Sequence, residues 1–231
     1  MLSIQNLTAG YGQSQVLQGV TLHIAPGEIV ALLGRNGSGR STLARAVMGQ
    51  VAAQGYIGWR GQNILGKMTF EIARLGIGYV PERRDVFAEL TVAQNLLLGQ
   101  KPGQPAGRWS VADMFGLFPQ LQLRYAVAAG VLSGGEQQML ALCRTLMGDP
   151  DLIVIDEPTE GLAPLLVEAV ANFLCILKTH GVSVLLIEQK LNVALQVADR
   201  CAVMGHGRVV WTGSPAEMQR NAPLQQEWLQ V

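Results

Sequence analysis

The sequence predicts an α/β protein with a mostly parallel central sheet. Three short apolar runs support this prediction, at residues 29–33, 152–155 and 182–187. Strands that are buried on both faces have this aliphatic composition. Helical patterns alternate with these runs, and such alternation is typical of a parallel sheet that is covered by helices.

The overall composition is that of an ordered globular protein. The chain has 231 residues, of which 49% are hydrophobic and 15% charged, and its formal net charge is zero. Nucleic-acid-binding proteins usually carry a basic stripe, so we expect no nucleic-acid partner. No apolar run approaches the roughly 20 residues of a membrane-spanning helix. The first residues lack the pattern of a secretion signal, and the cysteines lack metal-site spacing, so we expect a cytoplasmic protein.

The chain is expected to form one domain, residues 1–231, with three parts. Residues 1–30 alternate between apolar and polar side chains around turn residues, which predicts antiparallel strands. Residues 27–91 and 150–231 carry the strand and helix patterns of the α/β core. Residues 92–149 are mostly helical in pattern, which indicates an inserted helical part.

A glycine-rich segment follows the first apolar run and begins a helix. Glycine lets the backbone wrap closely around a phosphate chain, with its N–H groups at the positive end of the helix. Arg40 stands where the phosphate-loop pattern has lysine, and Ser41 can place its hydroxyl on Mg²⁺. The alternative is a strand-to-helix turn without a ligand. The expected nucleotide-binding residues are Gly34, Arg35, Asn36, Gly37, Ser38, Gly39, Arg40, Ser41 and Thr42.

Two carboxylates end the second apolar run. Asp156 and Glu157 follow it directly, and the ends of parallel strands are where α/β sheets present ligand-binding groups. Asp156 can hold the Mg²⁺ shell, and Glu157 can orient or deprotonate an attacking water. Such acids can also be an ordinary solvated strand end. The phosphate loop in the same chain favours hydrolysis.

A third motif precedes the carboxylate strand. In physical terms Ser133 is a helix N-cap, and Glu136 lies where the helix dipole favours a negative charge. The stretch from Val131 to Gln138 closely resembles the signature of ABC ATPases, a group of phosphate-loop NTPases, and the resemblance covers nearly the whole chain.

The resemblance implies a head-to-tail dimer in which each ATP is held by one subunit and capped by the signature of the other. The capping residues for the partner's ATP would be Ser133, Gly134, Gly135 and Glu136.

The resemblance implies further roles at single positions. Tyr11 looks like the aromatic residue that stacks on adenine, although a tyrosine in a turn is the alternative. Glu82 occupies the place of a glutamine that senses Mg²⁺ and faces the membrane partner, and a carboxylate cannot donate as an amide does. Gln189 stands where most members have a histidine that contacts the terminal phosphate. Glutamine can donate to that phosphate but cannot carry the charge.

Within the family, residues 78–84, 156–164 and 186–189 resemble the ATPases of importers for branched-chain amino acids, urea and amides. The resemblance implies an ATP- and Mg²⁺-dependent subunit on the inner face of the cell membrane. Its implied partners are a second ATPase subunit, integral permease subunits and, indirectly, a solute-binding protein. Because the fork of arginine is bulkier than lysine, we expect poor hydrolysis at the site built on Arg40. A catalytically weak module that completes a heterodimer and a non-transport ABC ATPase are the alternatives.

Overall fold

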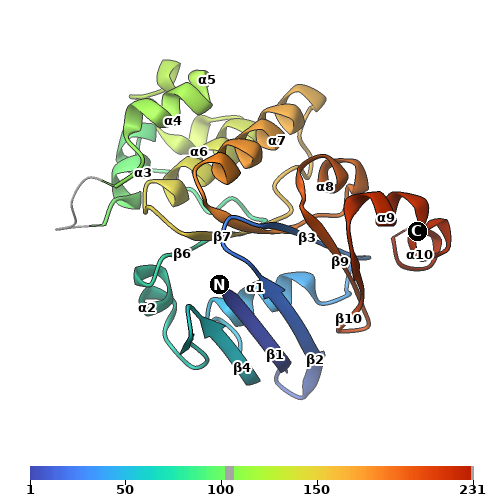
Figure 1. The fold of residues 1–231 in the computed structure, drawn as a ribbon. Coiled ribbons are helices and arrows are strands. Elements are labelled where there is room, and N and C mark those ends of the chain that lie inside the picture. Colours follow the sequence, from blue (N-terminus) through green and yellow to red (C-terminus); the bar gives the residue numbers. More distant parts are fainter. Residues whose placement is uncertain (102–106, 230–231) are drawn as a thin grey trace.

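The computed structural model describes residues 1–101 and 107–229, and Figure 1 shows their arrangement around a central sheet. This sheet has six strands in the order β10-β9-β3-β8-β7-β6. Its strands are β3 (Ile29–Leu33), β6 (Ile77–Val80), β7 (Leu152–Asp156), β8 (Ser183–Ile187), β9 (Arg200–Gly205) and β10 (Arg208–Gly213). All neighbours pair in parallel except β10, which is antiparallel to β9. The prediction of a mostly parallel sheet is therefore confirmed.

A second, antiparallel sheet has the order β2-β1-β4-β5. Its strands are β1 (Leu2–Tyr11), β2 (Ser14–Ile24), β4 (Ala53–Trp59) and β5 (Gln62–Asn63). The last two come from the range 27–91, which the sequence assigned to the α/β core, so this part of the division was too simple. The pairing of β4 with β1 runs from Leu2 opposite Trp59 to Ala9 opposite Ala53, and no local pattern reveals a partner so distant in the chain.

Helix α1 (Arg40–Val47) packs between the two sheets. Leu43 and Val47 belong to a buried cluster that also contains residues of β1 and β3, such as Leu2 and Leu32. All five residues of β3 are buried. Because both ends of the strand-to-helix turn are held by this packing, the glycine-rich segment between them has a fixed frame.

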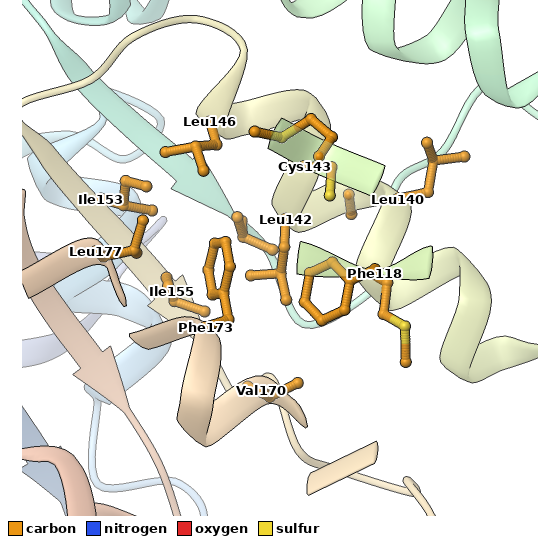
Figure 2. Packing of buried hydrophobic residues seen from close by; sticks show 14 of the residues in the cluster. Phe118, Leu140, Leu142, Cys143, Leu146, Ile153, Ile155, Val170, Phe173 and Leu177 are labelled. Atoms are coloured by element: carbon orange, nitrogen blue, oxygen red, sulfur yellow. The ribbon is translucent and has the colours of Figure 1, made fainter. Parts of the chain in front are cut away.

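The helices between β6 and β7 form a group on the opposite face of the central sheet (Figure 1). They are α3 (Val92–Gly99), α4 (Val111–Leu117), α5 (Pro119–Leu123), the 3₁₀ helix η1 (Ala129–Val131) and α6 (Gly134–Leu146). Leu142 of α6 and Phe118 pack against Phe173, and the two phenylalanine ring centroids are 5.6 Å apart (Figure 2). The same cluster contains Ile153 and Ile155 of β7, so the helices share a core with the strand that carries the carboxylates.

The remaining helices are α2 (Thr69–Arg74), α7 (Pro164–Thr179), α8 (Leu191–Val197), α9 (Pro215–Arg220) and α10 (Ala222–Trp228). Within the described ranges, no helix combines the length and the apolar character that a membrane crossing requires.

Candidate functional site

The glycine-rich segment forms a cradle between β3 and α1. Gly37 and Gly39 have positive φ angles of 79° and 104°, a region that side chains rarely adopt. A Cβ at Gly34 would lie 2.4 Å from the carbonyl oxygen of Met204, so this position requires glycine. The cradle borders a cavity of about 450 Å³, lined by Val16, Asn36, Gly37, Ser38, Gly39, Arg40, Ser41, Thr42, Glu82, Glu157 and Glu160.

The cradle contains hydrogen-bond donors that an anion could accept from. Gly39 caps α1 without any side-chain hydrogen bond, so among the described residues the first N–H groups of the helix have no side-chain acceptor. Ser38 Oγ is buried and has no hydrogen-bond partner among the described residues. Buried polar atoms are rarely left unpaired, so an orphaned hydroxyl at a helix N-terminus fits the oxygen of a phosphate.

Ser41 and Asp156 bring two oxygen atoms together at the edge of the cradle. Ser41 Oγ donates to Asp156 Oδ1 at 3.2 Å, and the Asp156 side chain is only 1% exposed. Burial raises the pKa of Asp156, while the bond from Ser41 opposes that increase. Mg²⁺ prefers such oxygen ligands and usually completes its shell with water and substrate phosphate. The two side chains therefore suit the magnesium role that the sequence assigned to them, and Glu82 lines the same cavity.

Glu157 and Arg40 form a partly buried ion pair, which the sequence did not reveal. Arg40 Nη2 lies 2.7 Å from Glu157 Oε1, and the two side chains are 5% and 11% exposed. Burial raises the pKa of Glu157, and the guanidinium of Arg40 opposes that increase. A carboxylate with a raised pKa beside a phosphate cradle is suited to act as a general base.

Gln189 does not line the cavity, although the sequence placed it at the terminal phosphate. Its backbone N–H donates to Glu188 Oε2 at 3.1 Å. Glu188 is buried and also accepts a 2.6 Å hydrogen bond from Thr159 Oγ1, so it joins the end of β8 to the loop after β7. Sequence reasoning missed Glu188. The signal was present, since Glu188 follows a buried strand just as Glu157 does.

Arg35 and Tyr11 also lie outside the cavity lining. Arg35 Nη2 donates to the carbonyl oxygen of Gln226 in α10 at 3.3 Å, so its side chain points toward the C-terminal helices. The Tyr11 ring is 45% exposed, and its hydroxyl accepts from Arg45 Nη1 of α1 at 3.2 Å. Tyr11 ends the strand whose hairpin partner supplies Val16 to the cavity.

The signature residues do not line this chain's own cavity. Ser133 caps α6 by accepting from the N–H of Glu136 at 3.3 Å, and the Glu136 carboxylate accepts from the N–H of Ser133 at 2.8 Å. The predicted N-cap is therefore confirmed. Gly134 lies close to a basic side chain, since a Cβ there would be 2.5 Å from Arg84 Nη1.

The cradle at a strand-to-helix turn and the carboxylates at a strand end of the same parallel sheet define the class of phosphate-loop nucleotide hydrolases. Comparison with known proteins makes the assignment specific. The sequence pattern of the family described as "ABC transporter" matches residues 17–160. The chain belongs to this family, and it is an ATP-hydrolysing subunit of an ABC transporter.

Relatives match the chain over almost its full length. It is 40% identical to the high-affinity branched-chain amino acid transport ATP-binding protein BraG of Pseudomonas aeruginosa, with 99% of both chains covered. It is 31% identical to the lipopolysaccharide export system ATP-binding protein LptB of Haemophilus influenzae, covering 99% of this chain and 97% of that relative. A solved nucleotide-free ATP-binding cassette of an ABC transporter is 30% identical, with a TM-score of 0.83 and coverage of 96% and 94%.

Proposed function

We propose that this chain energises an importer for branched-chain amino acids or a related small solute such as urea or an amide. The observation that carries the proposal is the 40% identity to BraG over 99% of both chains. The LptB relative, whose name refers to export, is less similar at 31% identity.

ATP would occupy the cradle of about 450 Å³, with its phosphates on the free N–H groups of α1. Ser41 and Asp156 would hold Mg²⁺, with Glu82 nearby, and the ion would neutralise charge on the phosphates. Glu157 would take a proton from the attacking water, and its raised pKa supports this role. Tyr11, which lies opposite Ser14 in the hairpin whose second strand carries Val16, would contact the base.

Two such subunits would associate head to tail, so that the signature of one caps the nucleotide of the other. The position of Ser133, Gly134 and Gly135 outside their own cavity supports this arrangement. Val131, two residues before Ser133, and Leu165, the chain neighbour of a leucine that Gly135 faces, are large exposed apolar side chains. Burial against a second ATPase subunit would remove them from water.

The permease subunits would bind in a second cavity of about 900 Å³. Its lining includes exposed Phe87 and Leu98 together with Glu82, which also lines the nucleotide cavity. A side chain shared by the two cavities supports coupling between nucleotide state and membrane partner. This association would hold the chain on the inner face of the membrane.

Arg40 favours a second possibility, in which this chain is a catalytically weak member of a heterodimer. Its guanidinium is engaged with Glu157 rather than free for phosphate. Placement of a few groups within about 1 Å dominates the rate of phosphoryl transfer, so a displaced cation slows hydrolysis. The intact signature at Ser133 would still complete the site of a more active partner.

One preparation tests both possibilities. The tagged chain is purified from native membranes with its associated subunits, reconstituted in vesicles, and assayed for ATP turnover with leucine, urea or short amides. Stimulation by one of these solutes through a solute-binding protein is expected. Purification with an export system, and no response to any solute, would overturn the importer assignment. Turnover of the chain alone, compared with the chain plus its co-purified ATPase, identifies a weak partner.

A further inference from the structure

Helix α10 contacts the end of β9 through the indole ring of Trp228. The centroid of this ring is 5.5 Å from that of the His206 ring, in an edge-on arrangement. A Cβ at Gly205 would overlap the indole, and the three atoms nearest to it all belong to Trp228. Glycine at position 205 therefore leaves the space that the indole occupies.

The turn between β9 and β10 contacts the phosphate cradle on its other side. The N–H of Gly207 donates to the carbonyl oxygen of Ser38 at 3.1 Å, and the carbonyl oxygen of Gly207 accepts from the N–H of Gln18 at 2.8 Å. One residue before the indole contact, the carbonyl oxygen of Met204 lies so close to Gly34 that no Cβ fits between them. The end of β9 and its turn therefore fix two points of the cradle, Gly34 and Ser38.

Two further contacts join α10 to the cradle. Arg35, which follows Gly34 in the chain, donates from Nη2 to the carbonyl oxygen of Gln226 at 3.3 Å. Trp228 also packs against a buried cluster that contains Leu33, the last residue of β3 before the cradle. Helix α10 is thus connected to the cradle directly, through the turn and through the core.

Among these contacts, the indole is the main anchor of α10. The hydrogen bond from Arg35 is exposed, so water competes for both of its partners and its net contribution is small. Tryptophan buries a large apolar area on a rigid ring, and Trp228 is partly buried against β9. A binding loop that is already held in its bound form loses less conformational freedom when the ligand arrives, which raises affinity.

We propose that Trp228 is a positioning residue for the nucleotide site, because it seats α10 on the β9–β10 turn and thereby keeps the phosphate cradle in the form that binds phosphate. Trp228 does not line the cavity, so it acts through the turn and not on the nucleotide itself. Loss of the contact would leave the central sheet intact but let the turn and the cradle move. The inference rests on the proposed function of this site.

Two substitutions remove the same contact in different ways. Trp228→Ala deletes the ring, and Gly205→Ala places a methyl group where the ring lies. Because the nearest neighbours of that methyl group belong to Trp228, Gly205→Ala should be tolerated once the ring is absent. The effects of the two substitutions on nucleotide affinity should therefore not add. Trp228→Phe keeps an aromatic ring at this position and is the conservative variant.

Affinity for MgADP, which this reaction does not consume, tests the proposal. Dissociation constants are measured by titration calorimetry at a temperature where melting curves show that every variant is folded. Trp228→Ala and Gly205→Ala should each weaken MgADP binding about fivefold, because the cradle must then be ordered on binding. The double variant should bind like Trp228→Ala, and Trp228→Phe should stay within about twofold of wild type. Phe118→Ala, in the buried cluster of the helices between β6 and β7, should lower the melting temperature but leave the affinity unchanged.

Three results would overturn the positioning role: unchanged affinity in Trp228→Ala, the same loss from Gly205→Ala with and without the ring, or an equal loss in Phe118→Ala. Trp228→Leu replaces Trp228→Ala if the latter does not fold. Wild-type protein that fails to bind MgADP would contradict the proposed function as well. Wild-type protein that binds MgADP without any dependence on Trp228 would contradict only the positioning role.

Discussion

Replacing Arg40 with lysine should make the protein less stable and more active. In the structure, the guanidinium makes three hydrogen bonds, to Glu188, Asn36 and Glu157. Lysine can retain the ion pair but not all three contacts. Two lost neutral hydrogen bonds and a weakened ion pair amount to about 2–3 kcal/mol of unfolding free energy. For a chain of this size, each kcal/mol lowers the melting temperature by about 2–4 °C, so a decrease of roughly 5–10 °C is expected.

Turnover should change in the opposite direction. A compact ammonium can sit between two phosphates, where the bulkier fork displaces them. A displacement of about 1 Å can cost on the order of a hundredfold in rate, so Arg40→Lys should raise ATP turnover by up to that factor. Phosphate release is measured at saturating MgATP over a range of protein concentrations, because the active form is expected to be a dimer.

Two further variants make the measurement specific. Glu157→Gln in the Arg40→Lys background should abolish the added turnover, which assigns it to this site. Arg208→Lys, at an exposed position on β10, should change neither stability nor turnover and controls for the type of substitution. Unchanged or reduced turnover in Arg40→Lys, with MgATP binding retained, would refute the reasoning from side-chain geometry.

Three other predictions follow from the structure. Asn95 is fully buried, and its side-chain amide shares two N–H donors among three backbone carbonyls. Asn95→Ala should therefore lower the unfolding free energy by about 2–4 kcal/mol in urea titrations, and a loss below about 1 kcal/mol would contradict this. Phe173→Ala should lower the unfolding free energy by about 3–5 kcal/mol in the same assay, because Phe173 is buried. Phe70→Ala, at an exposed position, should change it by no more than about 0.5 kcal/mol. Similar losses for the two variants would argue against the packing in Figure 2. Hydrogen bonds from the backbone and hydroxyl of Ser133 lower the pKa of Glu136, so its contribution to stability is complete above the usual glutamate pKa and is lost as the pH falls through the lowered folded pKa. Glu136→Gln should therefore lose less stability than wild type on acidification, and parallel pH profiles would disprove the assignment.

The features that are encoded within a few consecutive residues were predicted from the sequence. The apolar runs became β3, β7 and β8 because five consecutive buried residues need no partner information to be recognised. The glycine cradle could be predicted for a similar reason, because the positive φ angles at Gly37 and Gly39 favour glycine at these positions. The N-cap of α6 was equally local.

Contacts between side chains that are far apart in the chain could not be predicted from the sequence. Arg40 and Glu157 are separated by 117 positions, and Arg40 and Glu188 by 148. Their contacts exist only because β3, β7 and β8 align their ends at one edge of the central sheet. The same limit applied to the pairing of β4 with β1, and to the bond between Tyr11 and Arg45.

The sequence by itself determined that a phosphate cradle and two carboxylates exist, because each is encoded within a few consecutive residues. Only the tertiary structure decided which charges meet. An ion pair forms between side chains that the packing of the sheet brings within 3 Å, whatever their separation in the chain. Arginine at position 40 was visible from the start as a departure from the phosphate-loop pattern. That its partner is Glu157 required the fold.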